Sequence, residues 1–123
     1  MGSEYWQQAY RPLLPNIFQY EYGNQEAIDA IDEQAACIII EPIQAEGGDN
    51  HFRDEFFVGL RNLCDQNEVL LIFDEVQTGM GLTGKMWAYE HFSVVPDIIS
   101  FGKKAQVCGV LANKEKFDEI PNN

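Results

Sequence analysis

The chain has 123 residues with a formal net charge of −12 at neutral pH, and 46% of its residues are hydrophobic. This length is enough for one domain with a hydrophobic core. The acidity argues against nucleic acid or an anionic membrane surface as a partner, because binding phosphate groups requires Lys and Arg. No apolar run approaches the roughly 20 residues that a membrane-spanning helix needs.

Residues 1–24 are rich in aromatic side chains and are interrupted by Pro12 and Pro15, with no helical or strand period. We therefore predict an N-terminal arm or loop over 1–24. Because its aromatic residues do not fall on one face, we expect this arm to pack on something larger.

From Gln25 onward, the apolar pattern predicts alternating helices and strands. Helical patterns run from Gln25 to Ala35, from Arg53 to Asn67 and, more briefly, from Met86 to Phe92. Continuous apolar runs predict four strands, at Cys37–Ile40, Val69–Phe73, Ile98–Phe101 and Val110–Ala112.

The predicted order favours an α/β fold with a parallel sheet and right-handed crossovers. The strand Val69–Phe73 is apolar throughout, so we expect it to be covered on both faces. Gly47–Asn50 has the composition of a loop. No repeat, low-complexity tract or linker interrupts the chain, which therefore reads as a piece of one domain.

The three cysteines are odd in number and have no zinc-ligand spacing with either histidine. We therefore expect no metal site, and free thiols in a reducing cytoplasm. Cys37 and Cys64 lie within apolar patterns and are predicted to be buried.

Two of the predicted strands each deliver an ionisable residue where they end. Asp74 follows Leu70–Phe73, and Lys103 follows Ile98–Phe101 after a single glycine. Ligands of open α/β sheets bind beyond the carboxyl ends of the strands. A carboxylate and an amine brought to this edge therefore indicate a chemical site.

An amine held at a strand end can have its pKa lowered by burial and form a Schiff base. Lys103 fits this role, although most lysines are simply solvated, as we expect of its neighbour Lys104. Asp74 could bind magnesium, cap a helix or pair with a protonated ring nitrogen. The last role is the one that pyridoxal phosphate requires. Val76 could then lie against a ring face, and the Gln77 amide could donate to a phenolic oxygen.

A nucleotide site is the competing interpretation. Leu70–Glu75 has the form of a Walker B strand, and Gly79–Lys85 matches most of a phosphate loop. Met86 stands where a Ser or Thr would bind Mg²⁺, however, and the glycine-rich piece follows the acidic strand instead of preceding it.

Glu41 and Glu46 lie beyond the first predicted strand, in the segment Glu41–Gly48. We expect them at the same sheet edge as Asp74 and Lys103. Three successive strands that send polar groups to one edge indicate more than solvation.

The segments Glu41–Gly48, Phe73–Gly79 and Phe101–Lys103 together resemble class III pyridoxal-phosphate aminotransferases of fold type I. Within that family, Asp49–Arg53 and Gly102–Gly109 are most similar to the lysine 6-aminotransferases. The resemblance covers roughly residues 25–118. It implies that 25–123 is a partial cofactor-binding large domain, built on a segment of the parallel sheet of that fold.

Carried over by position, the resemblance implies a role for each candidate residue. Lys103 would form the imine with pyridoxal phosphate and move the proton, and Asp74 would hold the pyridinium. Val76 would stack on the ring, and Gln77 would contact its hydroxyl oxygen. Glu46 would be the switch glutamate that pairs with an Arg when the amino donor binds, and Glu41 would be a supporting acid.

The implied reaction transfers the ε-amino group of L-lysine to 2-oxoglutarate, in a homodimer whose second subunit contributes a Thr. The alternatives are ornithine or 4-aminobutyrate as the donor, and a non-catalytic α/β remnant or interaction module.

Family members are several times longer than this chain, and no phosphate-gripping Gly-Ser/Thr turn precedes its first predicted strand. We therefore expect the chain alone to bind the cofactor weakly and to turn over negligibly.

Overall fold

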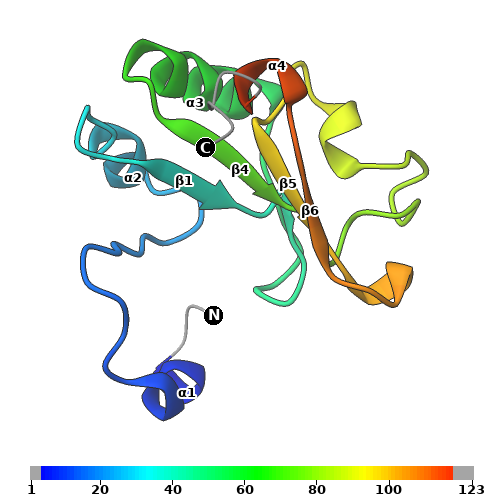
Figure 1. Ribbon diagram of the computed structural model, residues 1–123, viewed down its shortest axis with the longest axis horizontal. Helices are drawn as coiled ribbons and strands as arrows, with labels where there is room; N and C mark the ends of the chain where they lie inside the picture. Colours follow the sequence, from blue (N-terminus) through cyan, green and yellow to red (C-terminus); the bar gives the residue numbers. More distant parts are fainter. Residues whose placement is uncertain (1–3, 118–123) are drawn as a thin grey trace, which may run out of the picture.

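A four-stranded sheet is the centre of the computed structural model, which describes residues 4–117 (Figure 1). Its strands lie in the order β1-β4-β5-β6. Their bounds are β1 Cys37–Ile40, β4 Leu70–Asp74, β5 Ile98–Phe101 and β6 Gly109–Ala112. All four predicted strands are thus confirmed to within one residue at each end.

The sheet is parallel across β1, β4 and β5 and antiparallel between β5 and β6. The parallel part confirms the expected α/β architecture. The last strand departs from it because only the short turn of η3 (Lys103–Ala105) and the residues after it join β5 to β6. A parallel return needs a crossover of a dozen or more residues.

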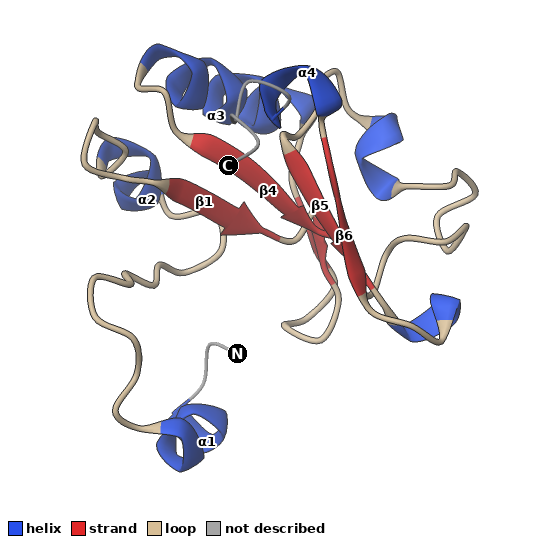
Figure 2. Cartoon of the chain, in the orientation of Figure 1, coloured by secondary structure: helices blue, strands red, loops and turns tan. Residues whose placement is uncertain are grey.

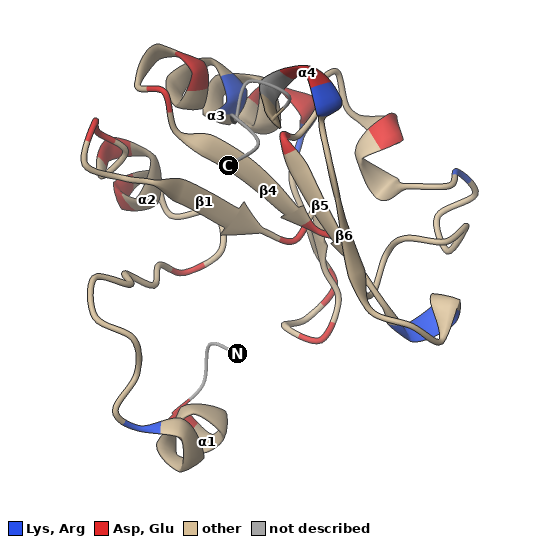
Figure 3. Ribbon diagram, in the orientation of Figure 1, with Lys and Arg blue, Asp and Glu red and all other residues tan. Residues whose placement is uncertain are grey.

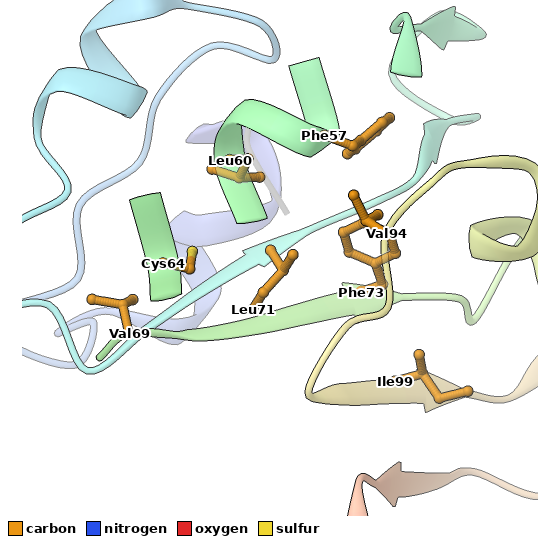
Figure 4. Close-up of a cluster of buried hydrophobic side chains, with 8 residues drawn as sticks. All are labelled: Phe57, Leu60, Cys64, Val69, Leu71, Phe73, Val94 and Ile99. Carbon is orange, nitrogen blue, oxygen red and sulfur yellow. The ribbon is translucent and has the colours of Figure 1, made fainter. Parts of the chain in front are cut away.

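One long helix, α3 (Asp54–Gln66), covers one face of this sheet (Figure 2). Its apolar stripe packs on β4 and β5 and forms the main core (Figure 4). The buried members of this core are Phe57, Leu60, Cys64, Val69, Leu71, Phe73, Val94 and Ile99. The helix predicted over Arg53–Asn67 is confirmed within one residue at each end.

Burial along β4 alternates. Leu71 and Phe73 are fully buried, whereas Leu70 and Ile72 are half-buried. On β1, Ile39 is paired with Ile72 and is 66% exposed. The expectation that both faces of β4 are covered is therefore wrong for the described residues, in which α3 lies on one face only.

The same alternation corrects the prediction for Cys37. It lies two residues from Ile39, on the face that α3 does not cover, and is exposed. Cys64 points from α3 into the core and is buried, as expected. Both are free thiols, as is Cys108.

The helix predicted from Gln25 to Ala35 is shorter in the structure. The helix α2 (Gln25–Asp29) begins at the Asn24 side chain, which accepts the Glu26 N–H. Beyond it, the Asp32 side chain accepts the Gln34 N–H, and such local bonds compete with a continuing helix. Ile31 and Ala35 still pack against the core. The apolar spacing therefore identified core residues correctly, although the helix ends at Asp29.

The remaining elements are short. A hairpin of β2 (Ile43–Gln44) and β3 (Asn50–His51) encloses the predicted loop, and its strands were not predicted. The expected helix at Met86–Phe92 is a 3-10 helix, η2 (Ala88–His91), and α4 (Lys114–Phe117) was not foreseen.

Within the predicted arm lie α1 (Glu4–Gln7) and η1 (Gln8–Tyr10), and Figure 1 shows α1 apart from the sheet. Several apolar side chains of the predicted arm are exposed, including Trp6 at 62% and Phe18 at 77%. No helix within residues 4–117 is both long and apolar enough to cross a membrane.

A buried carboxylate holds the turn that follows β4. Glu75 is 1% exposed and accepts three hydrogen bonds, from the Thr78 hydroxyl (2.6 Å) and from the backbone N–H groups of Ala88 (2.9 Å) and Tyr89 (2.8 Å). A buried charge is tolerated when its lone pairs are satisfied in this way. Glu75 thus ties the end of β4 to η2.

Replacing Glu75 by Gln should lower the free energy of unfolding by about 2 kcal/mol, because one buried backbone N–H would then face an amide nitrogen that cannot accept. Urea unfolding of the two proteins measures the difference. The matched control is Glu33→Gln, an exposed glutamate, for which we expect no measurable change. Equal stability of the Glu75 variant and its parent would contradict this role.

Candidate active site

Three strands end at one edge of the sheet, and the polar groups predicted for the site follow them. Because β1, β4 and β5 are parallel, Glu41, Asp74 and Lys103 all lie at or just beyond their carboxyl ends. Figure 3 shows the acidic ends of β1 and β4 and the basic turn η3 at this edge.

The Asp74 carboxylate is fixed by two hydrogen bonds to the same oxygen. Its Oδ1 accepts the Val76 N–H at 3.0 Å and the Ser100 hydroxyl at 3.0 Å. Ser100 is the residue paired with Asp74 in the β4–β5 register. Among the described residues, no donor contacts Oδ2. The half-buried carboxylate can therefore accept a further hydrogen bond from a ligand.

Lys103 and Gln77 are in direct contact. The Lys103 ammonium donates to the Gln77 side-chain oxygen, and the lysine itself is exposed. Its backbone has φ +41°, in the left-handed region that non-glycine residues rarely adopt. The Gln106 side chain and backbone N–H both donate to the Lys103 carbonyl, at 2.8 and 3.0 Å, and so support this conformation. Strained backbone of this kind concentrates at functional sites.

Glu41 connects the two halves of the cluster electrostatically. Burial raises its pKa above the ordinary 4.5, and repulsion by the Asp74 carboxylate raises it further. A hydrogen bond from the Ala45 backbone and the charge of Lys103 lower the pKa in part. Asp74 and Lys103 are therefore both close enough to act on the Glu41 carboxyl. We call these three residues and Gln77 the edge cluster.

Tyr22 holds the backbone beneath Glu41. Its hydroxyl donates to the carbonyl oxygens of Glu41 (3.0 Å) and Pro42 (3.3 Å). Burial, and then the Glu41 charge, raise the pKa of this phenol, so it remains a donor at neutral pH. Sequence reasoning assigned Tyr22 to the arm and missed this contact.

Glu46 is not part of the edge cluster. It lies exposed in the β2–β3 loop and has no hydrogen-bond or ion-pair partner among residues 4–117. The sequence places Glu46 at the same sheet edge as Asp74 and Lys103, and this placement stays a prediction.

The backbone at Gly102 lies close to the Val76 and Cys108 side chains. A Cβ atom on Gly102 would lie 3.1 Å from the Cys108 sulfur and 3.5 Å from a Val76 methyl. The absence of a side chain on Gly102 therefore leaves room for both side chains at the strand end. No role for Cys108 or Ser100 was predicted. A polar residue inside the apolar run Ile98–Phe101 was the available signal for Ser100.

The glycine-rich segment does not form a phosphate loop. A Walker loop cradles phosphate against the first turn of a long helix. Here Gly79–Lys85 is followed by the four-residue 3-10 helix η2, and the Lys85 ammonium donates to the Glu90 carbonyl. The segment is a turn anchored by Glu75, and the nucleotide interpretation lacks its structural context.

The architecture is shared with solved aminotransferases. A Plasmodium falciparum ornithine δ-aminotransferase superposes with TM-score 0.76 and 33% identity over 89% of this chain and 30% of its own. A lysine aminotransferase from Mycobacterium tuberculosis gives TM-score 0.64 and 62% identity over 66% of this chain and 19% of its own. The fold is therefore that of an α/β segment of such an enzyme.

The family follows from the sequence. The profile described as aminotransferase class-III matches residues 16–119, and the chain belongs to that family. The resemblance inferred from its motifs is thereby confirmed. The match begins at Asn16, within the segment predicted as an arm.

Curated relatives carry the name L-lysine-ε aminotransferase. The protein of Mycobacterium bovis is 57% identical over 97 residues, which are 79% of this chain and 21% of the relative. That of Streptomyces clavuligerus is 50% identical over 99 residues, 80% of this chain and 21% of the relative. A succinylornithine transaminase of Salmonella paratyphi A is 45% identical over 103 residues, 83% of this chain and 25% of the relative. The chain thus spans about a fifth to a quarter of their length.

The electrostatic link within the edge cluster can be measured. Asp74→Asn should lower the pKa of Glu41 toward 4.5, because it removes the charge that favours the protonated carboxyl. A raised pKa means that stability falls as pH rises through it, and this fall should be smaller in the variant. Carboxyl NMR titration gives the pKa, with the exposed Asp49→Asn as control. An unchanged Glu41 titration in Asp74→Asn would show that the two carboxylates do not interact.

Proposed function

We propose that this chain is the part of a pyridoxal-phosphate-dependent aminotransferase that holds the cofactor ring and binds it covalently through Lys103. The observation that carries the proposal is the edge cluster. In it, the acid that ends β4 and the amine that follows β5 lie at the same edge of the sheet. Membership of the class-III family supports it.

The residues present fit the ring end of this cofactor. A pyridinium needs an anion, and Asp74 has an oxygen without a donor among the described residues. An aldehyde needs an amine, which Lys103 supplies at the start of η3, just after the neighbouring strand β5. When bound, the cofactor supplies an electron sink for charge that develops on the substrate carbon.

Four candidate residues would then each have one role. Asp74 keeps the ring nitrogen protonated, and Val76 lies against the ring face. Gln77, which contacts Lys103, donates through its amide to the ring hydroxyl oxygen. Lys103 would be the covalent attachment point for the cofactor, and its side-chain amine would carry the proton to and from the substrate carbon.

The two glutamates act on the substrate side. Glu46, exposed on the β2–β3 loop, pairs with an Arg while the amino donor is bound and releases that Arg to receive 2-oxoglutarate. Glu41 supports this exchange next to Gln77. A glutamate without a partner among the described residues suits a role in which its partner changes.

L-lysine is the donor that we propose, with transfer of its ε-amino group to 2-oxoglutarate to give allysine and glutamate. Support comes from relatives named L-lysine-ε aminotransferase at 50–57% identity. We further propose that the complete protein is a cytoplasmic homodimer. Ornithine and 4-aminobutyrate are the competing donors, and the similarity to an ornithine aminotransferase favours testing ornithine first.

The attachment point is tested in the protein expressed from its full reading frame. Addition of pyridoxal phosphate should give a yellow protein that borohydride reduces to a stable adduct, located at Lys103 by peptide mass spectrometry. Lys103→Ala should lose the adduct and at least 10³-fold in kcat, because it removes both attachment and proton transfer. The matched control is the neighbouring Lys104→Ala, which should retain both. A Lys103→Ala protein that stays yellow and active would refute the proposal, and a non-catalytic remnant would show no adduct in any variant.

Donor specificity is read from glutamate formation in the presence of 2-oxoglutarate. We expect kcat/KM for L-lysine to exceed that for L-ornithine by about tenfold or more, since one methylene in a fitted pocket is worth roughly 10–200-fold. The same assay with 4-aminobutyrate should give a lower value still. A higher value for ornithine would assign the chain to a different donor within the same family.

A further inference from the structure

We propose that Ser100 is a positioning residue that fixes the Asp74 carboxylate so that its second oxygen faces the cofactor ring nitrogen. This inference rests on the proposed function. It concerns a residue to which neither the motifs nor the family resemblance gave a role.

The placement of Ser100 follows from the sheet register. Ser100 on β5 is the parallel partner of Asp74 on β4, and their side chains lie on the face opposite Leu71 and Phe73. The Glu75 N–H donates to the Ser100 carbonyl at 2.9 Å, which locks the two strands at this position. The Ser100 hydroxyl therefore reaches Asp74 from a rigid neighbour.

The two hydrogen bonds to Asp74 use one oxygen only. The bond from the Val76 N–H is local, two residues along the chain, whereas that from Ser100 comes from the adjacent strand, 26 residues away. Each carboxylate oxygen has about two acceptor sites, so Oδ1 is saturated. Rotation about the Cβ–Cγ bond would break both bonds, and Oδ2 is thereby left for a ligand.

The position of Ser100 also couples the acid to the amine. Ser100 stands three residues before Lys103 on the same strand and turn. A ring held between Asp74 and Lys103 needs a constant separation between the acid and the amine. The strand β5 hydrogen-bonds to Asp74 through Ser100 and leads directly into the turn that carries Lys103, so it keeps that separation constant. Without the hydroxyl, Asp74 is held by its own loop alone.

The test compares two variants of equal shape. Ser100→Thr keeps the hydroxyl and Ser100→Val removes it, and both residues favour strands. In the protein from the full reading frame, Ser100→Val should release pyridoxal phosphate about tenfold faster than Ser100→Thr. Tenfold is the effect of 1.4 kcal/mol, near the lower end for one hydrogen bond to a charged group. Release is measured by trapping the free cofactor.

A second readout is spectroscopic. The pH titration of the bound-cofactor absorbance should shift in Ser100→Val and return to the parent value in Ser100→Thr. The matched control is Ser93→Ala, since Ser93 also hydrogen-bonds an aspartate, Asp54, and neither residue belongs to the edge cluster. This control should match the parent in both measurements.

A double substitution tests whether Ser100 acts through Asp74. In an Asp74→Ala background, the Thr and Val variants should release the cofactor at the same rate, because no side-chain acceptor remains to be positioned. Equal release by the two variants in the parent background would overturn the proposal. So would an undiminished difference in the Asp74→Ala background. If Lys103→Ala keeps the cofactor adduct, the proposed function fails instead, and the two failures are distinct.

Discussion

The parallel register of β1, β4 and β5 is the constraint on which the rest of this structure depends. Pairing of Asp74 with Ser100 in this register brings the ends of β4 and β5 level, and β1 ends beside them. The carboxyl ends of three strands then converge on one edge through their backbone pairing. Glu41, Asp74 and Lys103 are close because the backbone hydrogen bonds place them there, against the repulsion between the two acids. Such a site is stable only on a scaffold whose stability comes from elsewhere.

That stability comes from the other face of the same strands. Leu71 and Phe73 alternate with Ile72 and Asp74 along β4, so the residues that pack under α3 and those that face the site share a strand but not a side. Glu75 then holds the turn after β4 through three hydrogen bonds to its buried carboxylate. Two adjacent acids thus serve opposite purposes. The Glu75 carboxylate is buried and accepts three hydrogen bonds from within the fold, whereas Asp74 retains one oxygen that no donor among residues 4–117 contacts.

The sequence predicted most of this arrangement, because its signals are local. Apolar runs marked the strands, helical spacing marked α3, and residues directly after strands marked the edge cluster. The failures have physical causes. The Asp32 turn ended α2 against its apolar period. The two-residue strands β2 and β3 are too short to have a pattern. Exposure of Cys37 depends on which face of the sheet α3 covers, and the local sequence does not reveal that.

Ser100 shows where sequence reasoning stops for a site of this kind. One hydroxyl in an apolar strand is a weak signal, since the sequence does not say which neighbour it meets. Only the register identifies that neighbour as Asp74, and only the saturation of one carboxylate oxygen indicates the direction in which the other is free. The residues that carry the chemistry are visible in the chain because they are ionisable. Those that orient them are neutral and common, and they become visible only when the strands are paired.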